Sequence, residues 1–106
     1  MEDTCKAIDT VLQKGDEGSI YNAGAGNEKT NLELAEKLVE LCDAENSLIN
    51  KVADRSGHDR RYSVNSDLIN ELGWTPQCDF EKGLENTVEW YRANRKWWEP
   101  LRNSNR

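Results

Sequence analysis

The sequence of 106 residues is poor in the residue types from which metal and redox sites are built. It contains one histidine, His58, and three cysteines, Cys5, Cys42 and Cys78, which lie far apart and form no Cys-x-x-Cys pair. A lone histidine without cysteine partners at ligand spacing makes no recognisable metal set. An odd number of scattered cysteines is typical of reduced thiols. We therefore expect no metal site and no disulfide framework.

Long apolar runs and a surplus of positive charge are also missing. No apolar run approaches the length of a membrane span, and residues 1–3 lack the basic and apolar regions of a secretory signal. Lys and Arg number 14 against 20 Asp and Glu, which gives a net charge of −6 and disfavours nucleic-acid backbones. With 36% hydrophobic and 32% charged residues, the composition predicts a small, soluble, cytoplasmic domain without membrane or nucleic-acid partners.

The residues that are present predict an α+β fold, a small lobe of short strands with about four helices. Helical spacing of apolar residues predicts helices over 3–14, from Thr30 to about residue 43, over 66–72, and from Asp79 onward. Thr30 followed by Glu33 predicts a capping box at the second helix. Short strands are predicted over 18–22, 47–53 and 62–64. The lobe is expected to span residues 1–101, followed by a frayed tail at 102–106.

The predicted core consists of the apolar stripes of three helices. They are Cys5, Ile8, Val11 and Leu12, then Leu34, Ala35, Leu38, Leu41 and Cys42, and finally Phe80, Leu84, Val88 and Tyr91. Among the four tryptophans, Trp74 and Trp90 are interpreted as packing residues. Trp97 and Trp98 are candidates for an exposed apolar patch.

The best candidate for a site is the segment 54–62, DRSGHDRRY, which follows a predicted strand. It holds the only histidine and three of the fourteen Lys and Arg residues. A guanidinium pairs bidentately with a phosphate, and a nearby imidazole can donate to the same anion. This combination indicates anion recognition at Arg55 and His58 and not bond breaking. The residue types alone leave open a solvated turn in which Asp54 and Asp59 offset the positive charges.

A second candidate is the glycine turn of residues 24–29, GAGNEK, between a predicted strand and a predicted helix. It imitates the start of a dinucleotide fingerprint, but Lys29 stands where the third glycine is required. We interpret the turn as the loop that presents Asn31 and the start of a helix, where free amides and the dipole favour an anion.

Five stretches, taken in order, carry a resemblance to a known family. Residues 2–9 resemble its V-E-D-H-C-R-A-[IL]-D start, and 20–31 resemble [VI]-Y-N-I-G-G-x-N-E-[RK]-[TK]-N. Residues 54–62 resemble a stretch containing R-P-G-H-D-R-R-Y, 71–76 resemble E-L-G-W-x-P, and 87–91 read T-V-E-W-Y. Together they resemble the C-terminal, substrate-binding part of the dTDP-glucose 4,6-dehydratases, which are extended short-chain dehydrogenases of the NAD-dependent epimerase/dehydratase family.

The resemblance implies a nucleotide-sugar-binding lobe that is inactive by itself. In this family, enzymes of deoxysugar biosynthesis convert dTDP-glucose to dTDP-4-keto-6-deoxyglucose with NAD held by an N-terminal Rossmann domain. The family's Tyr-x-x-x-Lys pair and glycine-rich fingerprint are missing here, so we expect no catalytic residue and no cofactor in this chain. Asn31, Arg55 and His58 match residues that bind the nucleotide sugar, whereas Arg60, Arg61 and Tyr62 are interpreted as structural. Ser56 replaces the usual proline.

The sequence is also compatible with other functions. Within the family, the chain can also be a fragment of a UDP-sugar epimerase or decarboxylase. Outside it, the chain can be a stand-alone nucleotide-binding module or a partner-binding protein. The expected partners are a dTDP-sugar or related nucleotide sugar, a missing N-terminal Rossmann domain, and a second copy in a homo-oligomer.

Overall fold

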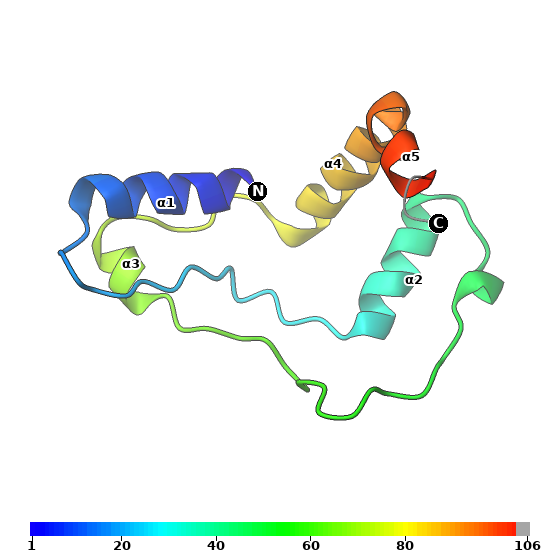
Figure 1. The fold of residues 1–106 in the computed structure, drawn as a ribbon, viewed down its shortest axis with the longest axis horizontal. Helices are drawn as coiled ribbons and strands as arrows, with labels where there is room; N and C mark the ends of the chain where they lie inside the picture. The colour runs from blue at the N-terminus through cyan, green and yellow to red at the C-terminus, as the bar shows by residue number, and fades with distance from the viewer. Residues whose placement is uncertain (104–106) are drawn as a thin grey trace. The chain divides into compact units, whose positions relative to one another are not determined.

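The computed structural model describes residues 1–103 and shows helices joined by extended segments. The helices are α1 (Glu2–Lys14), α2 (Asn31–Leu41), η1, a 3-10 turn (Asn46–Leu48), α3 (Asp67–Glu71), α4 (Phe80–Ala93) and α5 (Arg95–Asn103) (Figure 1). The chain divides into two compact units. The first unit is Met1–Glu28 with Ala53–Asp79, and the second is Lys29–Val52 with Phe80–Arg106.

The first unit has a small core between α1, α3 and the residues after α3. Ala7, Ile69 and Trp74 are buried there, with Ile69 only 1% exposed, and Val11 and Tyr21 pack against them. The buried indole N–H of Trp74 needs a hydrogen-bond acceptor. Trp74 Nε1 donates to the backbone carbonyl of Asp3 at 3.0 Å. The predicted packing role of Trp74 is thus confirmed.

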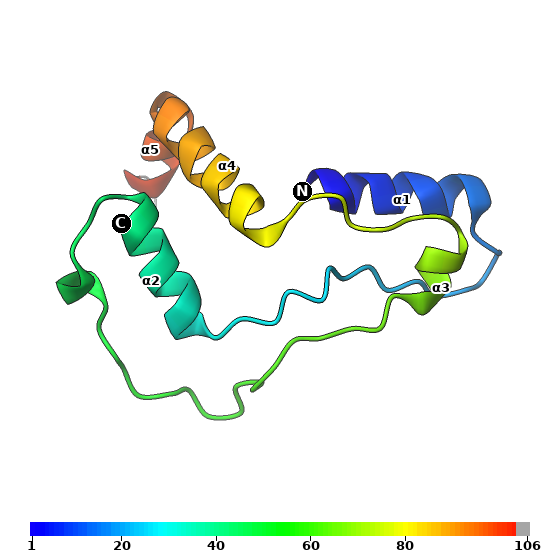
Figure 2. The same ribbon diagram turned by 180° about the vertical axis from the view of Figure 1, so that it is seen from behind.

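Two segments of the first unit that lie outside its helices, residues 18–28 and 53–66, run alongside each other (Figure 2). Gly24 N donates to Ser66 Oγ at 2.8 Å, and Ser66 Oγ donates back to the Gly24 carbonyl at 3.2 Å. A Cβ at Gly24 would lie 2.8 Å from Val64 Cγ2, so glycine permits this close approach. Further along, Arg61 Nη2 pairs with Glu28 Oε1 at 2.8 Å.

The predicted α+β class is wrong, because residues 1–103 contain helices and no strand. Residues 19–22 and 62–64 lie outside the helices and Gly18 is in a turn, but a strand requires a ladder of backbone bonds to a partner. The segments around them are joined instead by side chains, those of Ser66 and Arg61. Part of the second predicted strand, 47–53, forms η1, and Ile49 N, just after this turn, donates to Asn46 O.

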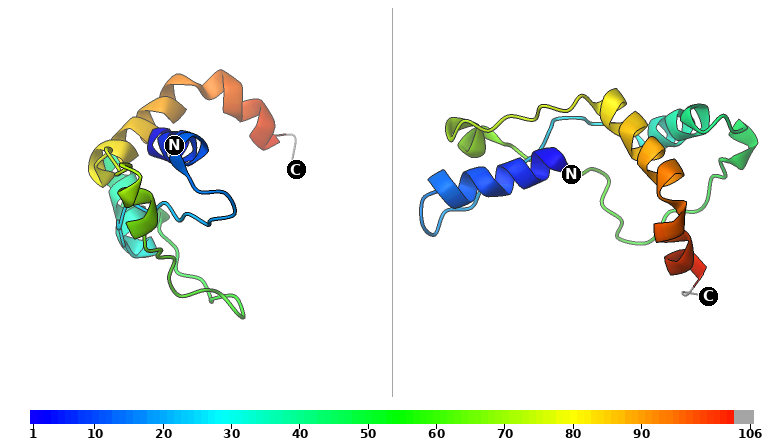
Figure 3. Two further views of the ribbon diagram at one scale, coloured as in Figure 1. Left: turned by 90° about the vertical axis from the view of Figure 1, so that its left-hand side faces the viewer. Right: turned by 90° about the horizontal axis from the view of Figure 1, so that it is seen from above.

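The second unit is built by α2 packing on α4, with α4 leading into α5 (Figure 3). Val88 is its buried apolar residue, at 8% exposure. Arg92 Nη2 donates to the Leu41 carbonyl at 2.7 Å, and Lys37 Nζ pairs with Glu81 at 3.1 Å. These two polar contacts tie the middle and the C-terminal end of α2 to α4.

The predicted positions of the helices are confirmed. The predicted buried faces are confirmed only in part. The capping box is present, with Glu33 N donating to Thr30 Oγ1 at 3.1 Å and Thr30 N donating to the Glu33 carboxylate at 2.7 Å. In α1, however, Ile8 is 64% and Leu12 83% exposed. Ala7, one position before the predicted Ile8, is the residue buried instead, because α3 and Trp74 meet that side of the helix.

At the end of the chain, α4 stops at Ala93 and α5 begins at Arg95. Arg102 and Asn103, which open the predicted frayed tail, belong to α5, and residues 104–106 lie outside the described part. Over residues 1–103, no helix has the length and apolarity needed to cross a membrane.

Candidate functional site

The predicted anion segment forms a turn organised by Asp54. One carboxylate oxygen of Asp54, Oδ1, accepts the backbone N–H of Arg55 at 2.9 Å and lies 2.8 Å from His58 Nδ1. The turn closes through His58 N, which donates to the Arg55 carbonyl at 3.3 Å. Gly57, inside the turn, has a φ of 71°, a conformation that glycine adopts without strain. The structure therefore brings Arg55 and His58 together, as the sequence predicts.

Both side chains of this turn have functional groups available to a ligand. Arg55 is exposed, and its guanidinium has no ion pair or hydrogen bond within residues 1–103. The His58 side chain is 28% exposed and uses Nδ1 toward Asp54, which leaves Nε2 free within the same residues. An exposed guanidinium and an imidazole held by a carboxylate can both donate hydrogen bonds to phosphate oxygens.

The other residues of the segment have different surroundings. Arg61 is bound to Glu28 Oε1, which also accepts from Ser63 Oγ at 2.9 Å. This agrees with the interpretation of Arg61 as structural. Arg60 and Asp59 are exposed and have no hydrogen bond or ion pair in the described part of the chain. Asp59 is therefore not the partner that compensates Arg55 or His58 by direct contact.

Asn31 is the first residue of α2 and is exposed. The start of this helix already holds a carboxylate, because Glu33 accepts from the Thr30 amide and from its hydroxyl. These bonds to Thr30, the amide first and then the hydroxyl, lower the pKa of the Glu33 carboxyl. This weakens the expectation that the helix start favours an anion, because the Glu33 carboxylate repels a second negative group there. Asn31 lies in the second unit, and the turn of residues 54–58 in the first.

The residues of the glycine turn do not fit a bound dinucleotide. The amide of Gly24 is occupied by Ser66 Oγ, and the amide of Glu28 donates to the Gly26 carbonyl at 3.0 Å. In a fingerprint, the glycine amides face the pyrophosphate and lead directly into a helix. Here α2 begins only at Asn31.

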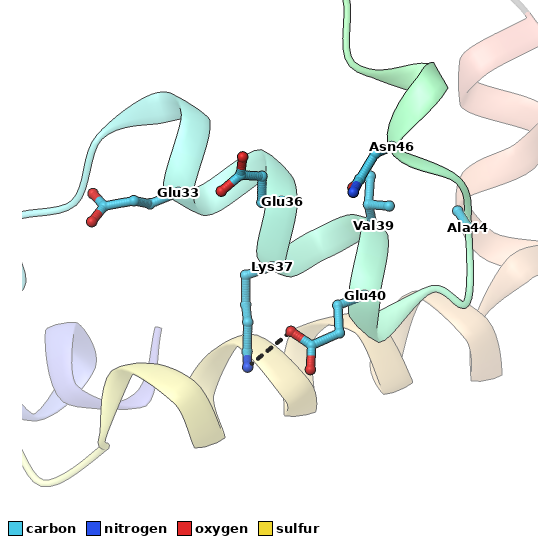
Figure 4. Close-up of a pocket in the computed structure, with 7 residues that line it drawn as sticks. All are labelled: Glu33, Glu36, Lys37, Val39, Glu40, Ala44 and Asn46. Carbon is cyan, nitrogen blue, oxygen red and sulfur yellow. Dashed lines mark ion pairs between the residues drawn. The ribbon is translucent and has the colours of Figure 1, made fainter.

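The second unit also has an open pocket beside α2, of about 540 Å³. It is lined by Glu33, Glu36, Lys37, Val39, Glu40, Ala44 and Asn46 (Figure 4). Lys37, its cation, pairs with Glu81 and with Glu40, and these contacts, the one with Glu81 first, raise the pKa of Lys37. With its lysine neutralised and three carboxylates on its wall, this pocket is unsuited to a phosphate.

An apolar groove of about 600 Å³ lies between α2, α4 and α5. Its wall includes Leu34, Leu38, Leu84 and Val88, which the apolar stripes predicted as core. The stripes do face one another, but the three leucines are only half-buried. Trp98 closes one side and donates its indole N–H to the Tyr91 carbonyl at 2.8 Å, whereas Trp97 is 63% exposed.

Sequence reasoning missed the role of Asp54 in the turn, which it treated only as a charge that offsets an arginine. The signal was the spacing Asp-x-x-Gly-His, in which a glycine turn can bring the histidine back to the aspartate. Because that contact depends on the backbone conformation at Gly57, the spacing alone does not establish it.

Comparison with known proteins gives this site a context: the chain is similar to sugar-nucleotide dehydratases. Several of these relatives are named dTDP-glucose 4,6-dehydratase. The enzyme of Streptomyces niveus is 50% identical over 103 residues, which cover 96% of this chain and 31% of that protein. The Escherichia coli enzyme is 43% identical over 96% of this chain. The low-salt glycan biosynthesis protein Agl12 of Haloferax volcanii is 45% identical over 86% of it. No family model matches the chain.

Solved structures agree with these sequence matches. The dehydratase DesIV of Streptomyces venezuelae, solved with NAD and TYD bound, matches 94% of this chain with a TM-score of 0.89 and 50% identity. The Bacillus anthracis enzyme, solved in complex with NAD, gives a TM-score of 0.86 and 48% identity. The predicted resemblance to part of dTDP-glucose 4,6-dehydratases is confirmed. The chain spans about 31% of the length of the curated relatives that it matches.

Proposed function

We propose that this chain is the nucleotide-sugar-binding portion of a dTDP-glucose 4,6-dehydratase. The observation that carries the proposal is the 50% identity to such an enzyme across 96% of the chain. On this proposal the chain serves the conversion of dTDP-glucose to dTDP-4-keto-6-deoxyglucose in deoxysugar biosynthesis. The remaining part of the enzyme, a Rossmann domain, holds NAD and supplies the reacting side chains. This chain contributes binding and orientation.

Within this function Arg55 and His58 hold the diphosphate, and Asn31 contacts the same nucleotide sugar. The free guanidinium of Arg55 and the free Nε2 of His58 support the first assignment. Charge-assisted hydrogen bonds to phosphate contribute about 1.5–3 kcal/mol each, which suffices to orient a ligand without any bond-breaking group. The exposure of Asn31 leaves its amide available for the second assignment.

The proposal is tested by reconstitution. The 106-residue chain is mixed or co-expressed with a polypeptide that covers the unmatched two thirds of a dehydratase, and loss of water from dTDP-glucose is followed by mass spectrometry. We expect no turnover and no retained NAD with the chain alone, and turnover with both parts. Arg55→Ala should reduce turnover. The matched control Arg60→Ala should not, because Arg60 lies in the same segment and has no hydrogen bond or ion pair within residues 1–103.

Two results would contradict the proposal. The first is a reconstituted complex that loses no activity with Arg55→Ala. The second is a preference for UDP-sugars over dTDP-glucose, which would favour an epimerase or decarboxylase. A complex that never assembles is distinguished from an inactive one by size-exclusion chromatography.

A further inference from the structure

We propose that Asp54 is the positioning residue of this site, which fixes both Arg55 and His58 for a phosphate ligand. The inference deepens the proposed function and rests on it. Asp54 itself carries a negative charge and does not bind the ligand; it acts through its two neighbours.

The contacts of Asp54 single it out within the turn. Its Oδ1 atom accepts from the Arg55 amide at 2.9 Å and lies 2.8 Å from His58 Nδ1. One oxygen atom thus joins the residues on both sides of Gly57. The Asp54 side chain is 78% exposed, so burial does not hold it in place, and these bonds define its orientation.

The bond to Nδ1 decides what the other ring nitrogen can do. With Nδ1–H directed at the carboxylate, a protonated imidazole presents its Nε2–H outward, where it can donate to a phosphate oxygen. The carboxylate 2.8 Å from Nδ1 fixes the plane of the ring, as carboxylates do for histidines that bind other ligands. Without the carboxylate, the imidazole is free to rotate, and the donor has no fixed direction.

If Asp54 acted only through its negative charge, removing that charge would strengthen phosphate binding, whereas a positioning role predicts weaker binding. The sign of the change in affinity therefore tests the inference. A carboxylate near an anion site repels the anion, so removing its charge should tighten binding. Asp59 provides the matched control: it lies in the same segment, is exposed, and has no hydrogen bond or ion pair in the described residues. Asp54→Asn and Asp59→Asn remove the same charge, but only Asp54→Asn weakens the hold on His58 and Arg55.

The experiment is an NMR titration of the 106-residue chain with thymidine 5′-diphosphate. We expect shifts at Arg55 and His58 in the wild type, with binding about tenfold weaker in Asp54→Asn, the effect of losing one well-directed charge-assisted bond. Binding to Asp59→Asn should be unchanged or up to about threefold tighter. Arg55→Ala should weaken binding whether or not Asp54 has a positioning role, and so reports on the site itself.

A second readout needs no ligand. Nitrogen shifts of the neutral His58 ring report which nitrogen carries the proton. We expect Nδ1–H in the wild type and in Asp59→Asn, and a shift toward Nε2–H in Asp54→Asn. Equal binding by the two asparagine variants, or an unchanged ring in Asp54→Asn, overturns the positioning role while leaving the proposed function intact. Absence of any wild-type response at residues 55–58 overturns both.

Discussion

Trp74 and Asp3 are joined by a hydrogen bond from the indole N–H to the backbone carbonyl, 3.0 Å long, although the residues are 71 positions apart. The carboxylate of Asp3 makes a second connection, accepting from Cys78 N at 2.9 Å and Gln77 N at 3.1 Å. The start of α1 is therefore fastened to the segment that follows α3. These bonds, with the buried ring of Trp74, hold together the core of the first unit.

Trp74→Phe should destabilise the first unit by about 1–3 kcal/mol, because it leaves a cavity in a small core and removes the donor to Asp3. Urea unfolding followed by circular dichroism measures the change. Trp97→Phe is the control, since Trp97 is 63% exposed and its indole N–H makes no hydrogen bond within residues 1–103. Equal losses of stability in both variants would contradict the assignment of Trp74 to the core.

Asp3 should make the first unit sensitive to acid. The amides of Cys78 and then Gln77 lower the pKa of its carboxyl below the ordinary 3.8. A pKa lowered by folding adds stability that is fully present above about pH 3.8 and is lost as the pH falls through the folded value. Asp3→Asn should be less stable than the wild type at neutral pH, and the two should converge in acid. A constant difference in unfolding free energy between pH 7 and pH 2 would contradict this.

The capping box of α2 predicts a loss of about 0.5–2 kcal/mol for Thr30→Ala, because the Glu33 amide loses its acceptor. Helical circular dichroism and the urea midpoint measure the loss. Thr30→Ser retains the hydroxyl and should stay close to the wild type. If serine and alanine destabilise alike, the hydroxyl bond does not contribute to the stability of this helix.

The sequence sufficed to locate the helices and failed on fold class. Helix positions follow from local signals, as in the Thr30 box and the apolar spacing of Leu84 and Val88, and these survive in the structure. A strand also depends on a partner, and residues 18–22 and 62–64, which lie outside the helices, form no ladder within residues 1–103. The local sequence pattern is the same for a strand that pairs with a neighbour and for a segment that does not, so the sequence could not distinguish the two.

The candidate site shows the same division between local and distant information. That Arg55 and His58 lie together was predictable, because three positions separate them across a glycine. The bond between Asp54 and His58 was not, since it depends on the φ of Gly57 and on a ring orientation. At Asn31, the sequence predicted both a capping box and a helix start that favours an anion. Four hydrogen bonds around Thr30 form that capping region and hold the Glu33 carboxylate at the helix start, so a second anion is disfavoured there.

The exposed face of α1 gives the last prediction, that the 106-residue chain self-associates through it. Ile8 and Leu12 lie on successive turns and are 64% and 83% exposed, and their burial is worth about 25 cal/mol per Å². Ile8→Lys with Leu12→Lys should therefore shift the chain toward monomer in sedimentation velocity and leave the helical signal unchanged. Ala7→Lys, by contrast, places a charge in the core and should unfold the first unit. A wild type that stays monomeric at high concentration, or a double variant that associates as strongly as the wild type, would show that this face is not the contact.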